Sequence, residues 1–555
     1  MKKILALCVA AALAIPGCVK VDNSLGTGLV DKSLMLDTYT VEFPITDIYM
    51  RPSSDLSAFS DSHLTIGSIR EKTFGLTTRE ASFPLIPALD EIDLGTNPVA
   101  KSFDLYFTMD TVSMANDTQE RILQNIYVYE LVEPLPKTAR PTNTVISRST
   151  DVVTKGIPIF NGSGGLNFSF TTEFAQKYVD AIRDLGPVLI DRDEKNPVDK
   201  YDDFVTQVPG ICIETEVPTG EGGRINLFNF SCLSVVNNYY QRNNNVGLLT
   251  VNSTWDGEQK DSTFMFIPGE TEFVDEEAYL EKNTKFSQYC LNTCGHETLA
   301  RKADDIILVE GGGGLKPVIS ALELQKKTRE AIIEKGGDPA KASIISASIV
   351  LPFDMPEDYL DLERFPSVLS PTIRTSVIRD GEEFFTFAGL TDASVSAEDQ
   401  GDIDRSNLIY SPDITYHMQE ILQPEESITL TQEEIEKGKA DIWLLTLHTN
   451  TVANASGQTA EQTQYYQNLM YASYYNSLYG GGYGGYGSGY NSYNNYYSYM
   501  MMAQMMAAQN QTTYTTTTEL DINRFYKAVL KGPEDPDPNP RALPHFIVVF
   551  AIPQR

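Results

Sequence analysis

The sequence predicts a mainly β protein: two β-sandwich-like units with a few helices and a long low-complexity insert rich in Tyr, Gly and Met. Three observations support this fold class. Short runs in which apolar and polar residues alternate recur along the chain, as expected of strands with one buried face. Clusters of Pro, Asn, Asp and Ser separate these runs. Only two segments show apolar residues at helical spacing.

The first unit is predicted over residues 36–303. Its clearest strand contains Phe103, Leu105 and Phe107, which place three aromatic or aliphatic side chains on one face. A helix is predicted over residues 171–185, where apolar residues recur every three or four positions. Further strands are expected at residues 39–43, 126–129, 166–170, 211–213 and 264–267.

The second unit is predicted over residues 304–555. A strand at residues 306–309 leads into four consecutive glycines, Gly311 to Gly314, and a helix is expected from residue 319 to 335. Pro317 stands where a phosphate-binding loop carries Ser or Thr, so we interpret the glycines as a turn or bulge between strands. Further strands are expected at residues 344–352, 384–387, 442–447 and 545–552.

The N-terminus has the pattern of a bacterial lipoprotein signal. Lys2 and Lys3 precede twelve apolar residues, which are too few to span a bilayer, and the run ends at Cys18. We therefore expect residues 1–17 to be a signal peptide, Cys18 to carry diacylglycerol and an acyl chain such as palmitate, and residues 18–35 to be a tether. Ordinary secretion after Ala14 is the alternative.

Four cysteines remain in the mature chain, and an even number in an exported protein permits two disulfides. Chain order favours Cys212–Cys232 and Cys290–Cys294, the second because residues four apart on a helix are close. A metal site at Cys290, Cys294 and His296 is the alternative, although the second ligand pair of a familiar zinc motif is missing from the sequence.

Residues 462–518 form the most unusual segment, because these 57 residues include no Asp, Glu, Lys or Arg. Thirteen tyrosines lie between Tyr465 and Tyr499, among short glycine runs. The segment has no apolar period, which predicts a flexible loop inserted between two strands. Tyrosine also suits partner contact, and we single out Tyr483, Tyr486 and Tyr490 as candidate contact residues.

Composition excludes some functions and supports no catalytic motif. The net charge of −32 repels phosphate backbones, so we expect no nucleic-acid partner. Neither a Gly-x-Ser-x-Gly elbow in a folded segment nor an HExxH motif is present, and the histidines are interpreted as structural or solvated residues: His63, His296, His417, His448 and His545. We therefore expect that the protein is not an enzyme.

No cofactor is expected, and calcium is the one metal that the sequence leaves open. Oxygen-rich side chains suit Ca²⁺, but neither acidic cluster follows the EF-hand order, and a solvated loop is the alternative. The clusters are Asp191, Asp193, Glu194, Asn196, Asp199, Asp202 and Asp203, and then Asp399, Asp402, Asp404 and Asn407.

Several motifs in a fixed order resemble those of a family of Bacteroidota outer-membrane lipoproteins that is catalogued only as a domain of unknown function. They follow the lipid cysteine Cys18 and are Ile66-Gly67-Ser68-Ile69, Phe74-Gly75, Lys101-Ser102, Val128-Tyr129-Glu130-Leu131, Val309-Glu310-Gly311-Gly312-Gly313 and Lys531-Gly532-Pro533. The resemblance covers nearly the whole mature chain apart from the insert. It implies an exported, anchored, β-rich protein and carries no catalytic residues with it.

The sequence therefore leads to one main functional hypothesis. We expect a lipid-anchored protein of the outer membrane, exposed at the cell surface, that serves as a non-catalytic accessory subunit of a β-barrel complex for uptake or outer-membrane protein assembly. Its partners are then a β-barrel protein or other lipoproteins. The alternative is a glycan-binding surface lipoprotein, with Trp255, Trp443 and tyrosines as sugar-stacking groups.

Overall fold

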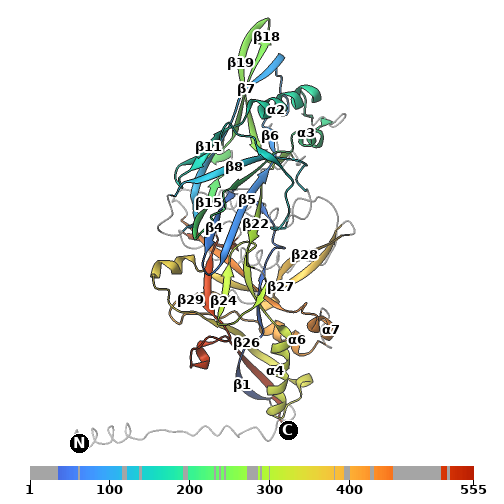
Figure 1. Ribbon diagram of the computed structural model, residues 1–555. Coiled ribbons are helices and arrows are strands. Elements are labelled where there is room, and N and C mark those ends of the chain that lie inside the picture. The colour runs from blue at the N-terminus through green and yellow to red at the C-terminus, as the bar shows by residue number, and fades with distance from the viewer. Residues whose placement is uncertain are drawn as a thin grey trace, which may run out of the picture.

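We describe the protein from a computed structural model, shown in Figure 1. The structure describes residues 36–554 apart from residues 61–62, 116–121, 137–140, 192–197, 230–232, 237–238, 243–244, 272–285, 288–289, 299, 380–381, 393–400, 425–429, 454–513 and 522–524. Within this part of the chain the fold is mainly β and the named sheets are antiparallel, which confirms the predicted fold class.

The first unit is built on one fourteen-stranded sheet, whose central order is β10-β8-β14-β5-β4-β15-β7-β18-β19-β6. Strand β22 pairs with β5 and β3, outside that path. The strands are β3 (Phe59–Ser60), β4 (His63–Glu71), β5 (Gly75–Phe83), β6 (Leu85–Pro87), β7 (Thr96–Ala115), β8 (Gln124–Leu131), β9 (Arg148–Val152), β10 (Ile159–Phe160), β11 (Gly165–Ser169), β14 (Ile211–Thr215), β15 (Gly222–Asn229), β18 (Gly247–Trp255), β19 (Glu258–Pro268) and β22 (Cys290–His296). The smaller elements are β12 (Ile190–Asp191), β13 (Val198–Asp199), β16 (Leu233–Val236), β17 (Tyr239–Arg242), β20 (Glu270–Thr271), β21 (Phe286–Ser287), α2 (Thr172–Leu185) and α3 (Tyr201–Gln207).

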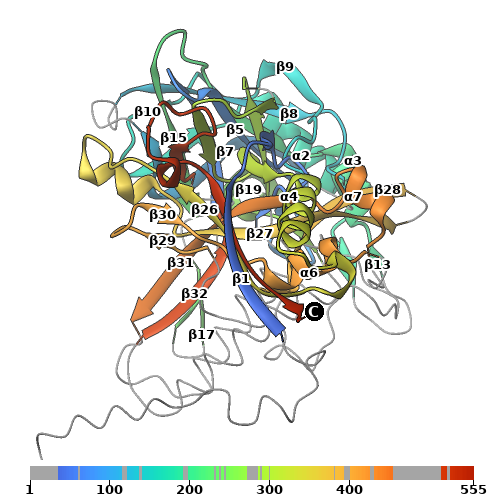
Figure 2. The same cartoon turned by 90° about the horizontal axis from the view of Figure 1, so that it is seen from below.

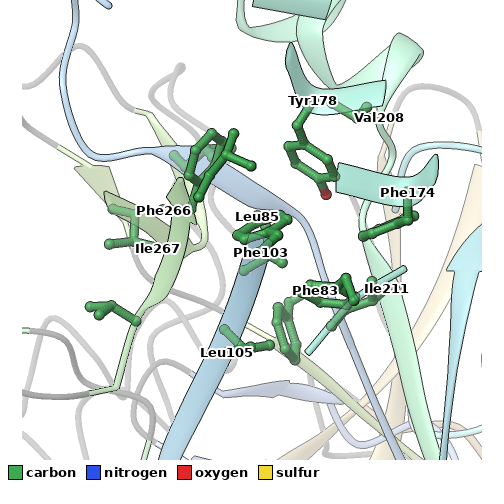
Figure 3. Packing of buried hydrophobic residues seen from close by; sticks show 14 of the residues in the cluster. Phe83, Leu85, Phe103, Leu105, Phe174, Tyr178, Val208, Ile211, Phe266 and Ile267 are labelled. Atoms are coloured by element: carbon green, nitrogen blue, oxygen red, sulfur yellow. The ribbon is translucent and has the colours of Figure 1, made fainter. Parts of the chain in front are cut away.

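Aromatic rings from strands and from α2 meet in the core of the first unit. The Phe103 ring lies 4.9 Å from Phe170, 5.1 Å from Tyr178 and 5.2 Å from Phe266, measured between ring centroids. Figure 3 shows Tyr178 of α2 in the same core as Phe103 and Phe83 of the sheet. Phe103, Leu105 and Phe107 are all buried in this core, as the alternation over residues 103–107 predicts.

The predicted helix over residues 171–185 is confirmed as α2, and its start has a local cause. The Thr171 hydroxyl accepts a hydrogen bond from the Phe174 amide at 3.2 Å, which satisfies one of the free N–H groups of the first turn. The helix ends at Gly186, whose φ of 84° suits glycine better than other residues.

The second unit contains a five-stranded sheet, a seven-stranded sheet and a two-stranded ribbon. The five-stranded order is β1 (Leu36–Pro44), β34 (His545–Pro553), β26 (Ser343–Pro352), β30 (Ile409–Tyr410) and β29 (Ile403–Asp404). The seven-stranded sheet comprises β23 (Arg301–Lys302), β2 (Ile48–Pro52), β25 (Leu315–Ile319), β31 (Ile442–Ala453), β27 (Val368–Arg379), β28 (Glu382–Gly389) and β32 (Tyr514–Leu520). The ribbon pairs β24 (Ile306–Glu310) with β33 (Lys527–Lys531). The helical elements are α4 (Ala321–Glu334), α6 (Thr415–Leu422), α7 (Gln432–Glu436), η3 (Pro339–Lys341), η4 (Tyr359–Arg364) and η5 (Pro540–Ala542).

The boundary between the two units differs from the predicted one at the start of the described chain. Strand β1 pairs with β34 along its whole length, and β2 pairs with β25. Residues 36–52 therefore belong to the sheets of the second unit, not to the first. The chain starts in the second unit, forms the first unit from β3 to β22, and then returns to the second unit. Two segments of the chain therefore connect the two units.

The hairpin β31–β32 carries the low-complexity insert. Its pairing runs from Leu447↔Leu520 to Ala453↔Tyr514, so residues 454–513 leave and re-enter the fold at one point. Residues 514–518, which were predicted to belong to the insert, are the first part of strand β32. Figure 2 shows this end of the hairpin and the start of β1 pointing toward the same side of the molecule.

Candidate functional site

The candidate site lies on one face of the strand pair β5–β22, where the two units meet. In the antiparallel register, Cys294 lies opposite Arg79 and His296 lies opposite Thr77. Paired residues in antiparallel strands, and residues two apart in one strand, point to the same face. Four chemically active side chains therefore share one small area of the sheet.

The glycine-rich turn between β24 and β25 closes over this face. A Cβ at Gly313 would lie 2.2 Å from the Thr142 hydroxyl, and a Cβ at Gly312 would lie 2.8 Å from Nη2 of Arg79. Such distances are far below van der Waals contact, so only glycine permits this close approach. The predicted turn is therefore confirmed, and its glycines serve close packing against the first unit.

Lys316 is the internal amine donor of the same turn. Its fully buried amine donates to the carbonyl oxygens of Glu310, Gly312 and Gly314, at 3.0 Å for Gly312 and 3.4 Å for Gly314. Burial lowers the pKa of Lys316 to about 7, although the carboxylates of Glu310 and Asp521 oppose the shift. A phosphate cradle points backbone N–H groups at its ligand, whereas this turn points carbonyl groups at its own lysine.

Glu310 is the central anion of the site. Its buried carboxylate accepts a 2.6 Å hydrogen bond from the Thr77 hydroxyl and lies 2.9 Å from Nδ1 of His296 and 3.3 Å from Nζ of Lys527. Burial alone raises the pKa of Glu310, but the neighbouring His296 and Lys527 outweigh burial and hold the pKa well below its ordinary value. Glu310 is therefore ionised, and it joins His296 of the first unit to Lys527 of the second.

His296 links Glu310 to Cys294. Nδ1 of the imidazole faces Glu310, while Nε2 contacts Sγ of Cys294. Burial lowers the pKa of His296, but the Glu310 carboxylate and the Cys294 sulfur outweigh burial and raise the pKa to about 9. We call Cys294, His296 and Glu310 the thiol relay, because a thiol, an imidazole and a carboxylate follow one another along a single line of contacts.

A cavity of about 420 Å³ borders the far side of this cluster. Lys527 and Glu71, which both line the cavity, form an ion pair, and Lys527 also contacts Glu310. The rest of the lining combines apolar and charged residues, including Phe74, Phe365, Asp354 and Lys531. Lys527 therefore connects Glu310 of the thiol relay to the cavity.

The predicted Cys290–Cys294 disulfide is wrong. Both residues lie on strand β22, where four residues span about 13 Å, far more than the ~4.4–6.8 Å between Cα atoms that a disulfide requires. Cys212, Cys290 and Cys294 are thiols and not half-cystines in the structure. Cys232, the predicted partner of Cys212, lies outside the described residues. Burial raises the pKa of Cys212 to about 12, so this thiol is unreactive at neutral pH.

The alternative of a metal site at Cys290, Cys294 and His296 does not fit this geometry either. Cys290 lies four residues from Cys294 on strand β22, about 13 Å away, so Cys290, Cys294 and His296 face no common point. Across the part of the chain that the structure describes, no group of three His, Cys, Asp or Glu side chains could hold a metal ion. Asp404, from one predicted calcium cluster, instead accepts hydrogen bonds from Ser406 and Asn407.

The other residues predicted from sequence are scattered or lie outside the described residues. Cys18, Tyr483, Tyr486, Tyr490 and part of each acidic cluster fall outside them. His417 is buried and its Nε2 lies 2.9 Å from the Ala440 carbonyl, which is a structural role. Trp443 is 6% exposed and packs against Phe387, so it offers no face for sugar stacking.

Sequence reasoning missed most of this site because its members come from five strands. Only one signal was present: Cys294 and His296 are two residues apart, which places both side chains on one face if the segment is a strand. Arg79, Glu310, Lys316 and Lys527 join them only through tertiary pairing. The interpretation of residues 290–294 as a helix concealed the one usable signal.

The chain matches no protein-family model, no curated protein and no solved structure. Among the described residues, no helix is both long and apolar enough to cross a membrane.

Proposed function

We propose that the protein is an outer-membrane lipoprotein, anchored through Cys18, that acts as an accessory subunit of a β-barrel complex. The barrel serves nutrient uptake or the assembly of outer-membrane proteins. The anchor follows from the apolar run that ends at Cys18, together with the resemblance described above.

One observation carries the docking role. The start of β1, where the tether enters the fold, and the free end of the β31–β32 hairpin point toward the same side of the molecule (Figure 2). The tether of residues 18–35 spans at most about 60 Å when extended. An anchor on this side therefore brings the uncharged, tyrosine-rich insert close to the membrane surface, where the rim of a barrel lies.

The composition of the insert supports partner contact at that position. Thirteen tyrosines offer flat surfaces that can pack against a partner at a low cost in side-chain entropy, and the methionines adapt to irregular surfaces. The net charge of −32 lies outside this segment, which has no charged residue and so meets no like-charge repulsion at a partner. The β18–β19 end of the first unit lies at the opposite end of the molecule from β1 (Figure 1).

The register of the hairpin gives a clean experiment. Ala453 and Tyr514 are already paired, so residues 454–513 can be replaced by Asn-Gly, which closes a two-residue hairpin without loss of pairing. The matched control keeps the insert at full length and replaces its thirteen tyrosines by serine. The wild type and both variants are then purified under native conditions from solubilised outer membranes, and cell fractionation locates Cys18→Ser.

We expect a β-barrel protein in stoichiometric amount with the wild type and its loss with the Asn-Gly variant. Loss with the serine variant assigns docking to the tyrosines, and retention assigns it to the rest of the insert. Cys18→Ser should leave the protein unlipidated and outside the membrane fraction. A wild-type protein that comes out alone refutes the accessory role and directs the work to glycan arrays, the alternative function.

A further inference from the structure

The thiol relay has the arrangement of a nucleophilic site. A nucleophile is recognised by a base within hydrogen-bond reach that a third group in turn orients. Nε2 of His296 contacts Sγ of Cys294, Nδ1 lies 2.9 Å from Glu310, and Thr77 and Lys527 hold Glu310 in place. Each bond in this series fixes the next, so the ring of His296 has one orientation.

We propose that Cys294 is the nucleophile of an acyl-transfer site, with His296 as its acid–base group and Glu310 as the positioning carboxylate. The substrate class is a small ester or thioester. This activity differs from the expectation that the protein is not an enzyme, and it does not depend on the proposed accessory role.

The surroundings of Cys294 favour this chemistry. Arg79 lies directly opposite in the register, it is buried, and its Nε has no hydrogen-bond partner within the described structure. Its guanidinium is held 3.7 Å above the Phe525 ring. A buried donor that lacks a partner, on the same face as the nucleophile, is suited to the oxyanion that develops during acyl transfer.

Accessibility separates Cys294 from the other two described cysteines. Cys212 and Cys290 are buried, whereas Cys294 is partly exposed. Partial exposure makes Cys294 the described cysteine that a reagent in solution reaches most readily. A small acyl compound can therefore reach Cys294, and the substrate class is limited to small molecules for the same reason.

The reaction balances without a further reactant. Nε2 of His296 and the Cys294 sulfur share one proton, since the raised pKa of His296 keeps the imidazole protonated at neutral pH. The Cys294 sulfur attacks the acyl carbon and an S–C bond forms, while that proton stays on Nε2. The C–O or C–S bond of the substrate breaks, and the leaving alcohol or thiol takes that proton. Water then attacks the thioester with His296 as base, the carboxylic acid leaves, and Cys294 regains its proton.

The first test uses the wild-type full chain and needs no variant. The protein is treated with p-nitrophenyl acetate, and digested samples are analysed by mass spectrometry to give an acetylation rate for each cysteine. We expect Cys294 to react at least about 100-fold faster than Cys290 and Cys212. A rate at Cys294 no higher than that of the same cysteine in the urea-unfolded chain overturns the proposal.

Variants then assign the roles. Cys294→Ser should abolish the release of nitrophenol beyond background, and Cys290→Ser should leave it unchanged. His296→Gln should slow acetylation about 100-fold while circular dichroism stays that of the wild type. Glu310→Gln should move the pH profile of acetylation to lower pH, because Glu310 raises the pKa of His296. A lower rate with an unmoved pH profile limits Glu310 to a structural role and refutes its part in the relay.

Discussion

Glu310 offers the sharpest test of the energetics at the junction. The substitution Glu310→Gln keeps the shape of the side chain and removes its charge. It leaves Lys527 with the ion pair to Glu71 alone, and it leaves His296 beside a neutral amide. Because these groups are buried, the loss of one partner is costly, and breaking such a pair lowers stability by about 3–5 kcal/mol.

The pKa of His296 gives a second estimate of the same energy. It is about 9 in the folded chain against an ordinary value of 6.5, with Glu310 as the foremost of the groups that raise it, and at about 1.36 kcal/mol per pKa unit this difference corresponds to roughly 3 kcal/mol. The two estimates agree. A histidine with a raised folded pKa contributes stability that is complete below pH 6.5 and is lost as the pH rises through 9. The cost of Glu310→Gln should therefore be about 3 kcal/mol larger at pH 6 than at pH 10.

Urea unfolding of wild type and Glu310→Gln at pH 6 and pH 10 measures these values. The matched control is Glu433→Gln, which removes a carboxylate paired with Lys437 at 2.5 Å on the surface of α7. Exposed pairs of this kind contribute little, so the control should change stability by less than about 0.5 kcal/mol at both pH values. A cost for Glu310→Gln below about 1 kcal/mol, or one that is equal at both pH values, refutes the assigned role of the relay.

Three further predictions follow from backbone and burial. Gly67→Ala should cost about 3 kcal/mol in urea unfolding, because its Cβ would lie 2.1 Å from the Arg224 carbonyl, whereas Gly220→Ala, which meets nothing within 4 Å, should stay within about 0.5 kcal/mol. In the wild type, the lowered pKa of Lys316 makes stability rise with pH above 7, and this rise offsets part of the stability that is lost as His296 loses its proton. Lys316→Met removes the rise, so stability should fall more steeply between pH 7 and pH 9 than in the wild type. An unchanged slope contradicts the burial of a neutral lysine. Thr171→Ala should lower stability by about 1 kcal/mol through loss of the α2 cap, and no change in the unfolding midpoint would contradict that role.

Elements whose cause is local were predictable from the sequence. Alternation over residues 103–107 places Phe103, Leu105 and Phe107 in the core, and helical spacing over residues 171–185 gives α2 with its Thr171 cap. The glycine run at residues 311–314 is a turn between two strands. Pro317, at the position where a phosphate-binding loop carries Ser or Thr, predicts this. In each case the information lies within one segment of the chain.

Features whose cause is a pairing between distant segments were not predictable in this way. The assignment of residues 36–52 to the second unit depends on the partners of β1 and β2, which come more than 250 residues later in the chain. The thiol relay likewise depends on the register of β22 against β5. Amphipathic alternation reports which face of a strand is buried, but it contains no information about the strand that pairs with it.

The disulfide prediction shows how one local error removes a site. Residues four apart are neighbours on a helix and far apart on a strand, so interpreting residues 290–294 as a helix favours a Cys290–Cys294 bond. As a strand, the same segment separates those two sulfurs and instead places Cys294 beside His296. A proton relay needs both nitrogens of the histidine, and the second one finds its partner in Glu310, on the far side of the junction.

The docking role and the thiol chemistry reside in different parts of the fold, which makes them separable by experiment. The hairpin β31–β32 belongs to the seven-stranded sheet, whereas Cys294 and His296 lie on β22 of the fourteen-stranded sheet. The Asn-Gly replacement of residues 454–513 keeps the Ala453↔Tyr514 pair and should leave acetylation of Cys294 within about twofold of the wild type, because it changes no contact of the relay. Conversely, Cys294→Ser should still recover the barrel partner in full. If both variants lose both properties, the proposed separation fails, and the junction must be treated as one site that senses the partner and acts through the thiol.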